Sequence, residues 1–203
     1  MHGGTRWSRQ RWIRFWSSPG WWPAAYRARH VPGCSRRGGG LDRVGVRGVD
    51  ELRPRRARCS SCLVTHVLLP VTVLLRRADA AAVIWAALLA RAAGRGHRTI
   101  AAGLRVPAST VRGWLRRMNT RLEQVRVHFT VVARRAGIDQ SAPTAAGNAW
   151  RDLVAAVGAA WVAVTTRFGP AGLVGAVTVG QVAAASSGGR LLAPGWPVSP
   201  GHC

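Results

Sequence analysis

The sequence predicts a mainly α-helical protein with a small β module ahead of its helices. Three observations predict this fold class. From Arg76 onward, alanine-rich segments carry apolar residues at helical spacing. Before Pro70, short runs with β-branched residues over 43–47 and 51–58 flank the turn-like Gly48-Val49-Asp50. Both ends of the chain lack periodicity, so we expect disordered termini.

The charge of the chain is strongly positive. Its 203 residues include 30 basic side chains, all arginine, against 7 acidic ones, a formal net charge of +23. Residues 1–70 carry 14 arginines and 3 acids, residues 71–135 carry 13 and 2, and residues 136–203 carry 3 and 2. Such a field favours nucleic acid or an anionic membrane surface and disfavours cationic partners. The first two-thirds of the chain is therefore expected to meet the polyanion.

The chain divides by composition into five segments. We expect a disordered Trp/Arg-rich leader, a zinc-ribbon-like module, a helix-bearing domain, a C-terminal amphipathic helix and a low-complexity tail. Their ranges are 1–33, 34–70, 76–135, 148–168 and 169–203. No apolar stretch follows the arginines of the leader, so a signal peptide is not expected. The longest apolar runs, 78–90 and 171–185, are shorter than the ~20 residues that span a bilayer, and we expect a cytoplasmic protein.

The helical part is expected to contain four helices. Ala78–Ala93 is the first, with Gly94 as its stop. His97–Gly103 is a short second helix. The third begins near Ala108 and extends as far as Arg135, and the fourth, Ala149–Arg167, repeats apolar residues at helical spacing. Residues 136–147, with Gly137, Pro143 and Gly147, are expected to be a linker.

The segment from Gly96 to Leu115 has the pattern of two helices that cross over a short turn. Ala101 is the small residue where the two backbones approach, and Ser109, or its neighbour Ala108, opens the second helix, where a short polar side chain can cap free amides. The apolar positions are Ile100, Leu104, Val106, Val111 and Trp114. Over about 20 residues this pattern resembles the helix-turn-helix of bacterial regulators and transposase-associated proteins, which implies a three-helix, homeodomain-like domain. Arg105 departs from it, because many members have Gly there.

The resemblance implies double-stranded DNA as the partner, with the second helix in the major groove. The expected DNA-binding residues are His97, Arg98, Ser109, Thr110, Arg112, Gly113, Arg116 and Arg117. Arg112 and Arg116 would bond guanine edges and Gly113 would permit close approach. His97, Arg98 and Arg117 would meet phosphates. The alternative is a helical hairpin with a solvated arginine face.

Three of the four cysteines and a histidine suggest a structural Zn²⁺ site. Cys59-x2-Cys62 has the spacing of a zinc knuckle. The second knuckle is incomplete, since Arg37 stands where a partner of Cys34 would be. The expected ligands are Cys34, Cys59, Cys62 and His66, with His30 as the other choice for the fourth. The alternative is a relic ribbon that has lost its metal.

Taken together, residues 34–135 resemble an actinobacterial family of zinc-ribbon/helix-turn-helix proteins, which in turn resemble the N-terminal DNA-binding part of insertion-sequence transposases. The likeness is best over 51–118 and is carried by Arg53-Pro54-Arg55-Arg56-Ala57-Arg58-Cys59, Thr65-His66-Val67-Leu68-Leu69-Pro70, Arg76-Arg77-Ala78-Asp79 and the helix pair. It implies a transcriptional regulator or a transposase-associated DNA-binding protein. It implies no specific reaction.

Three further questions follow from the sequence. An apolar stripe with heptad spacing over 111–132 either forms a homodimer or packs on the Trp150–Val164 helix of the same chain. The seven acids are too scattered to gather two catalytic metals, and no phosphate-binding glycine loop is present, so we do not expect an enzyme. A membrane-surface protein that uses the Trp/Arg leader is the alternative function.

Overall fold

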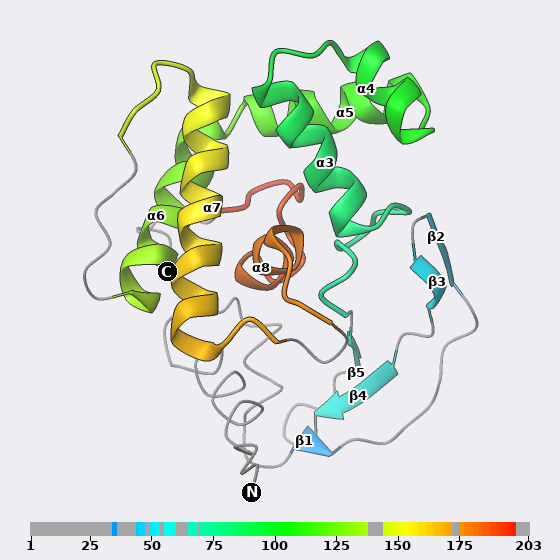
Figure 1. The fold of residues 1–203 in the computed structure, drawn as a ribbon. Coiled ribbons are helices and arrows are strands. Elements are labelled where there is room, and N and C mark those ends of the chain that lie inside the picture. The colour runs from blue at the N-terminus through cyan, green and yellow to red at the C-terminus, as the bar shows by residue number, and fades with distance from the viewer. Residues whose placement is uncertain are drawn as a thin grey trace, which may run out of the picture. The chain divides into compact units, whose positions relative to one another are not determined.

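The computed structural model describes five strands between residues 34 and 68, and then residues 70–137, 144–171 and 175–197. The expected leader, residues 1–33, lies outside the described residues. The chain divides into two compact units. The first contains residues 1–45 and 51–70, and the second contains residues 46–50 and 71–203. The described part is mainly helical, as the sequence predicts (Figure 1).

The first unit contains an antiparallel three-stranded sheet in the order β1-β4-β5. Its strands are β1 (Cys34–Ser35), β4 (Arg55–Cys59) and β5 (Thr65–Leu68). Cys34 is the register partner of Cys59, and Ala57 is the partner of His66. Pro70 ends this unit, where the sequence predicts the end of the β module.

A second, two-stranded sheet pairs β2 (Val44–Val46) with β3 (Val49–Leu52). The sequence prediction is wrong here in two respects. Val49 and Asp50 begin β3 and do not form a turn, because a β-branched valine favours extended backbone. The expected strand over 51–58 is two strands, and Pro54, which lacks the amide that a ladder needs, lies between them.

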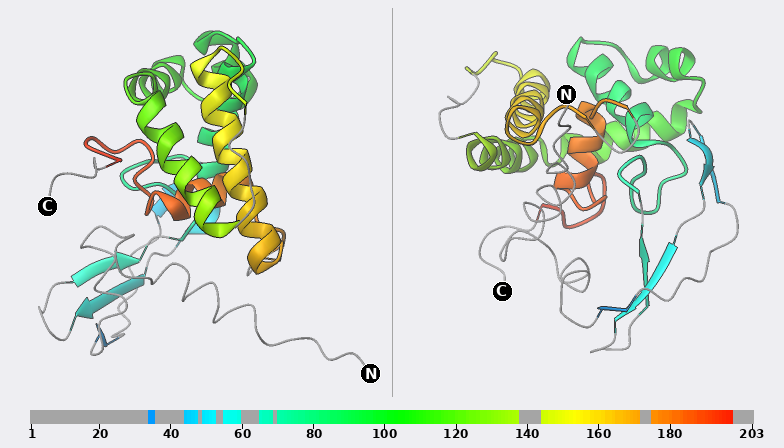
Figure 2. Two further views of the ribbon diagram at one scale, coloured as in Figure 1. Left: turned by 90° about the vertical axis from the view of Figure 1, so that its left-hand side faces the viewer. Right: turned by 60° about the horizontal axis from the view of Figure 1, so that its bottom comes forward.

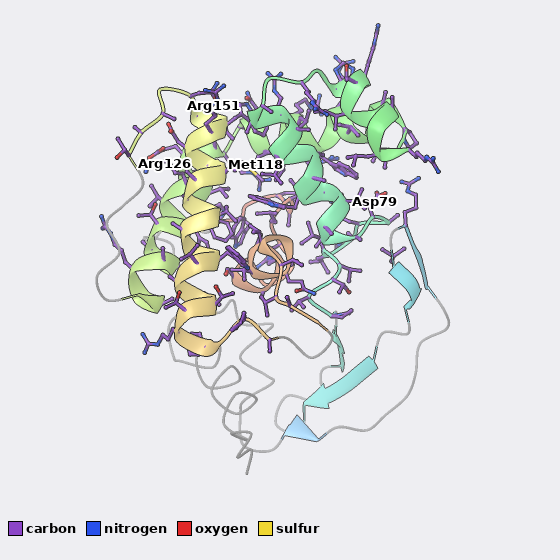
Figure 3. The ribbon with its side chains drawn as sticks, in the orientation of Figure 1. Asp79, Met118, Arg126 and Arg151 are labelled. Carbon is purple, nitrogen blue, oxygen red and sulfur yellow. The ribbon has the colours of Figure 1, made fainter. Side chains whose placement is uncertain are left out.

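Residues 46–50, which lie within the expected module 34–70, belong to the second unit together with the helices. Val46 is buried, and Arg47 is tied to Asp79, the residue labelled near the base of α3 in Figure 3. Arg47 Nε donates to Asp79 Oδ1 at 2.7 Å, and Nη2 donates to Oδ2 at 3.2 Å. Asp79 is almost fully buried, and the bidentate guanidinium balances its charge there.

The described residues of the second unit form six helices. They are α3 (Ala81–Ala92), α4 (His97–Leu104), α5 (Ala108–Asn119), α6 (Leu122–Ala136), α7 (Ala149–Phe168) and α8 (Val179–Ser186). Gly94 follows α3 with a φ of 86° and supplies the expected stop. Arg151, in the first turn of α7, donates to the carbonyl oxygen of Ala92 at 3.4 Å and joins α7 to the end of α3 (Figure 3).

The expected helix over 108–135 is broken between α5 and α6. Thr120 Oγ1 donates to the carbonyl oxygen of Arg117 at 3.0 Å, and the amide of Arg121 donates to Met118 at 2.9 Å. The sequence offers no Gly or Pro at this position. The break is imposed by packing, because Met118 and Val125 are both fully buried on separate helices that pack against different neighbours.

α6 and α7 lie side by side and run in the same direction (Figures 1 and 2). Arg167, near the end of α7, donates to the carbonyl oxygen of Arg135 near the end of α6 at 3.0 Å. Residues on their facing sides are fully buried: Val125, Phe129, Val132, Leu153, Val157 and Val164. The α6 part of the apolar stripe therefore packs on α7 in the same chain, as one of the two expected arrangements has it, whereas the α5 part packs on α3 and α4.

The expected low-complexity tail contains ordered structure, so leaving 169–203 unassigned is wrong for residues 175–197. Thr178 caps α8 in a reciprocal capping box with Gln181. A β-carbon on Gly180 would stand 3.4 Å from Ala81 O and Trp85 Cβ, so α8 packs tightly on α3. Leu191, Leu192 and Trp196 are buried after it.

None of the helices in the described ranges has both the length and the apolar character needed to cross a bilayer.

Candidate nucleic-acid interface

α4 and α5 are joined by three residues, Arg105, Val106 and Pro107. Arg105 has φ 53° and ψ 41°, the left-handed region that glycine favours. Its amide donates to Ala102 O at 3.3 Å, and the amide of Val106 donates to Ala101 O at 3.1 Å. These are the two hydrogen bonds of a Schellman motif. The departure from Gly at 105 therefore leaves the tight turn intact.

The turn is held by buried residues on both sides of it. Ile100 and Ala101 of α4 are buried, and Val106 is buried within the turn. α5 buries one face against α3 and α4 through Val111, Trp114, Leu115 and Met118. The small and apolar residues expected to fix the two helices are thus inside the fold, with the exception of Leu104, which is only partly buried.

The opposite face of α5 carries the expected base-contacting residues. Ser109, Arg112 and Arg116 follow one another at steps of three and four, and all are exposed. Thr110 and Gly113 lie beside them and are partly exposed. This arrangement leaves two guanidinium groups free to project from one helical face.

Arg117 is also exposed, and its side chain lies along Gly113. A β-carbon added at Gly113 would stand 3.1 Å from Arg117 Nη1. The absence of a side chain at 113 thus makes room for this guanidinium. Of the expected residues, Ser109, Thr110, Arg112, Gly113, Arg116 and Arg117 come together on α5.

Of the two residues expected to open α5, Ala108 is the one that does so, and the expected cap by a short polar side chain is absent. The N-cap residue is Pro107, Ala108 is the first helical residue, and no side chain accepts a hydrogen bond from the helix end. Ser109 lies in the first turn of α5, so its own backbone amide is one of those that have no acceptor within the helix. The amides of Thr110 and Val111 both donate to the carbonyl oxygen of Pro107, at 3.0 and 3.2 Å, so only the amides of Ala108 and Ser109 are left for an acceptor from outside the helix.

The remaining two expected residues, His97 and Arg98, lie in the first turn of α4. Arg98 is exposed and His97 is partly exposed. Gly96 is the N-cap residue, no side chain caps the helix, and its first turn contains no acidic residue. An uncapped helix N-terminus with basic neighbours favours an anion such as a phosphate.

Two further exposed arginines, Arg95 and Arg105, lie close to these helix ends and are not among the residues expected from the sequence. The sequence feature that could have identified them is charge alone, since residues 95–121 contain seven arginines and no acidic residue. The acidic side chains that the structure describes are occupied elsewhere. Asp79 binds Arg47, Glu123 binds Arg126, and Asp152 accepts from the amide of Ala146 at 2.6 Å. The surface of α4 and α5 is therefore purely basic.

Three of the four expected metal ligands belong to the same sheet. Cys34 and Cys59 are register partners, and His66 is the partner of Ala57, two residues before Cys59. Register partners and residues two apart share a sheet face. Cys62 lies outside the described residues. Among the side chains that the structure does describe, no three His, Cys, Asp or Glu gather to hold a metal.

Comparisons with protein-family models, with curated proteins and with solved structures give no match.

Proposed function

We propose that the chain binds double-stranded DNA through a helix-turn-helix formed by α4 and α5, with α5 in the major groove. The observation that carries the proposal is the position of Arg112 and Arg116. Both are exposed on one face of a helix whose other face is fixed by buried residues. A guanidinium in such a position can bond the O6 and N7 atoms of guanine with two parallel hydrogen bonds.

The other residues of this surface have supporting roles in the proposal. Gly113 adds no side chain to this face of α5, which lets the helix approach the DNA closely. Ser109 and Thr110 lie at the end of α5 that is nearest the bases in such complexes. Arg98, His97 and the uncapped amides of α4 bond the phosphate backbone. Binding then releases counterions, so affinity falls steeply with salt.

The proposal includes no dimer through residues 111–132, because Val111, Phe129 and their neighbours in that stripe are already buried within the chain. It assigns no catalytic step. A transcriptional regulator and a transposase-associated DNA-binding protein would use the same contact.

The direct test is selection of binding sites from random duplexes with the full chain. We expect an enriched motif that contains guanines, and an affinity that falls linearly with salt on a logarithmic plot. Binding to anionic liposomes without affinity for any duplex would overturn the proposal and favour a membrane-surface role.

A structural Zn²⁺ is the second part of the proposal. The residues that would hold it are Cys34, Cys59, Cys62 and His66. The backbone register supports this set, because directly opposite strand residues lie close enough for two thiolates to share one ion. Metal content measured on the purified chain should show one zinc, and a double Cys59→Ser/Cys62→Ser variant should show none. If the wild type and the double variant contained the same amount of zinc, the proposed zinc site would be wrong.

A further inference from the structure

Arg77 and Arg121, from separate parts of the chain, bind the same short stretch of backbone. Arg77, just before α3, donates through Nη2 to the carbonyl oxygen of Leu192 at 2.8 Å. Arg121, between α5 and α6, donates through Nη1 to the carbonyl oxygens of Ala193 and Trp196, the latter at 2.6 Å. Leu192 and Ala193 are consecutive, so the two guanidinium groups are neighbours.

Arg117 is joined to this pair through its backbone, and its positive charge repels both guanidinium groups. Arg121 Nε donates to the carbonyl oxygen of Arg117 at 3.1 Å. Burial, followed by repulsion from Arg117, lowers the pKa of Arg77 from its ordinary value. Burial, then Arg117, then Arg77 lower the pKa of Arg121. No carboxylate among the described residues offsets this repulsion.

The cluster also has hydrogen-bond donors to spare. Arg77 Nε is buried and has no partner among the described residues. The guanidinium of Arg117 makes no hydrogen bond within the described part of the chain and is exposed. A buried donor without a partner is costly, and neighbouring guanidiniums repel unless an anion lies between them. An anion with several oxygens, reached through the exposed Arg117, relieves the repulsion, whereas Arg77 Nε is sealed from solvent and is not one of the donors offered to it.

We propose that Arg77, Arg117 and Arg121 form a phosphate-binding site. Arg117 is the exposed arm of the site, and the other two are positioned by the carbonyl oxygens of residues 192–196. Phosphate fits because its tetrahedral oxygens can accept from several guanidinium forks at once. The phosphate comes either from the backbone of a duplex held by α5, which rests on the proposed function, or from a free phosphorylated small molecule, which does not.

The test compares Arg117→Gln with Arg134→Gln in the full chain. Both remove one exposed charge, but Arg134 lies on α6 and is not one of the three arginines. Pyrophosphate, followed by titration calorimetry, is the first probe. The wild type and Arg134→Gln should bind it equally, and Arg117→Gln should bind about tenfold more weakly, as expected for loss of a charge-assisted hydrogen bond.

A second arm uses a random-sequence duplex. If the phosphate belongs to DNA, the duplex competes with pyrophosphate, and Arg117→Gln lowers the salt slope of duplex binding by about 1. If it belongs to a free molecule, pyrophosphate binding survives an excess of duplex. The site is overturned if Arg117→Gln matches Arg134→Gln with both probes. That result would not affect the proposed role of Arg112 and Arg116 in base contact. If instead the chain bound pyrophosphate but no duplex, the proposed DNA binding would be wrong and the phosphate site would remain.

Discussion

The amide of Val106 donates to the carbonyl oxygen of Ala101 at 3.1 Å, across a turn in which Arg105 is left-handed. This hydrogen bond ends α4 and sets the direction in which α5 leaves. Because a non-glycine residue in this conformation costs free energy, the turn is the one place where the helix pair stores strain.

Replacing Arg105 with Gly should leave the free energy of unfolding unchanged or raise it by up to about 1 kcal/mol. Relief of the left-handed strain is partly cancelled by the greater freedom of glycine in the unfolded chain. Urea denaturation measures the change. The matched control is Arg112→Gly, in the interior of α5, which should lower the free energy of unfolding by about 1 kcal/mol. A large loss for Arg105→Gly would show that the arginine side chain itself holds the turn.

Arg112→Ala and Arg116→Ala should each cost about 1–3 kcal/mol of discrimination at one base pair of the preferred site. Arg98→Ala should instead weaken binding to all duplexes alike, because a phosphate contact carries no sequence information. Selection from random duplexes and competition binding separate the two effects. If the double variant Arg112→Ala/Arg116→Ala kept the full preference of the wild type, α5 would not be the helix that contacts the bases.

Stability should fall as the pH drops from 7 towards 5 because of His128. Its ring contacts Phe129 and Trp196 at centroid distances of 5.2 and 4.9 Å, and its Nε2 lies 3.2 Å from the carbonyl oxygen of Ser186. Burial lowers the pKa of His128 below its usual value of 6.5, although the hydrogen bond to Ser186 opposes this.

The unfolded chain therefore binds a proton at this histidine at a higher pH than the folded chain does. Stability is complete above the unfolded pKa and declines as the pH falls from there through the folded value. Urea midpoints at several pH values should show this slope, and His128→Gln should flatten it. If His128→Gln kept the wild-type slope, another group would be responsible for the pH dependence.

Leu192→Ala should lower the free energy of unfolding by about 2–5 kcal/mol, the usual cost of removing a large side chain from a packed core. Leu192 has 0% exposure, in a segment whose composition suggests a solvated tail. Val162→Ala is the control, because Val162 is 41% exposed, and it should cost less than about 1 kcal/mol. Equal and small effects would show that residues 191–197 are not part of the core.

The sequence predicts the helix pair well because its signals are local. Gly94 follows the end of α3, Gly96 is the N-cap residue of α4, and Pro107 precedes the first residue of α5. The spacing of apolar residues over 100–115 indicates which side of each helix is buried. These are properties of near neighbours in the chain. They place Arg112 and Arg116 on the exposed face before any tertiary contact is known.

Other features were decided by contacts between distant residues. Three features have no signal in the neighbouring sequence, because each depends on a surface contributed by another part of the chain. They are the break at Thr120 and Arg121, the parallel pairing of α6 with α7 and the burial of Trp196. The same holds for the arginine cluster. Arg77 and Arg121 are 44 positions apart in the sequence, and only the fold brings both to the carbonyl oxygens of residues 192–196. Local pattern thus determined which residues face solvent on α4 and α5, and tertiary packing determined which charges meet.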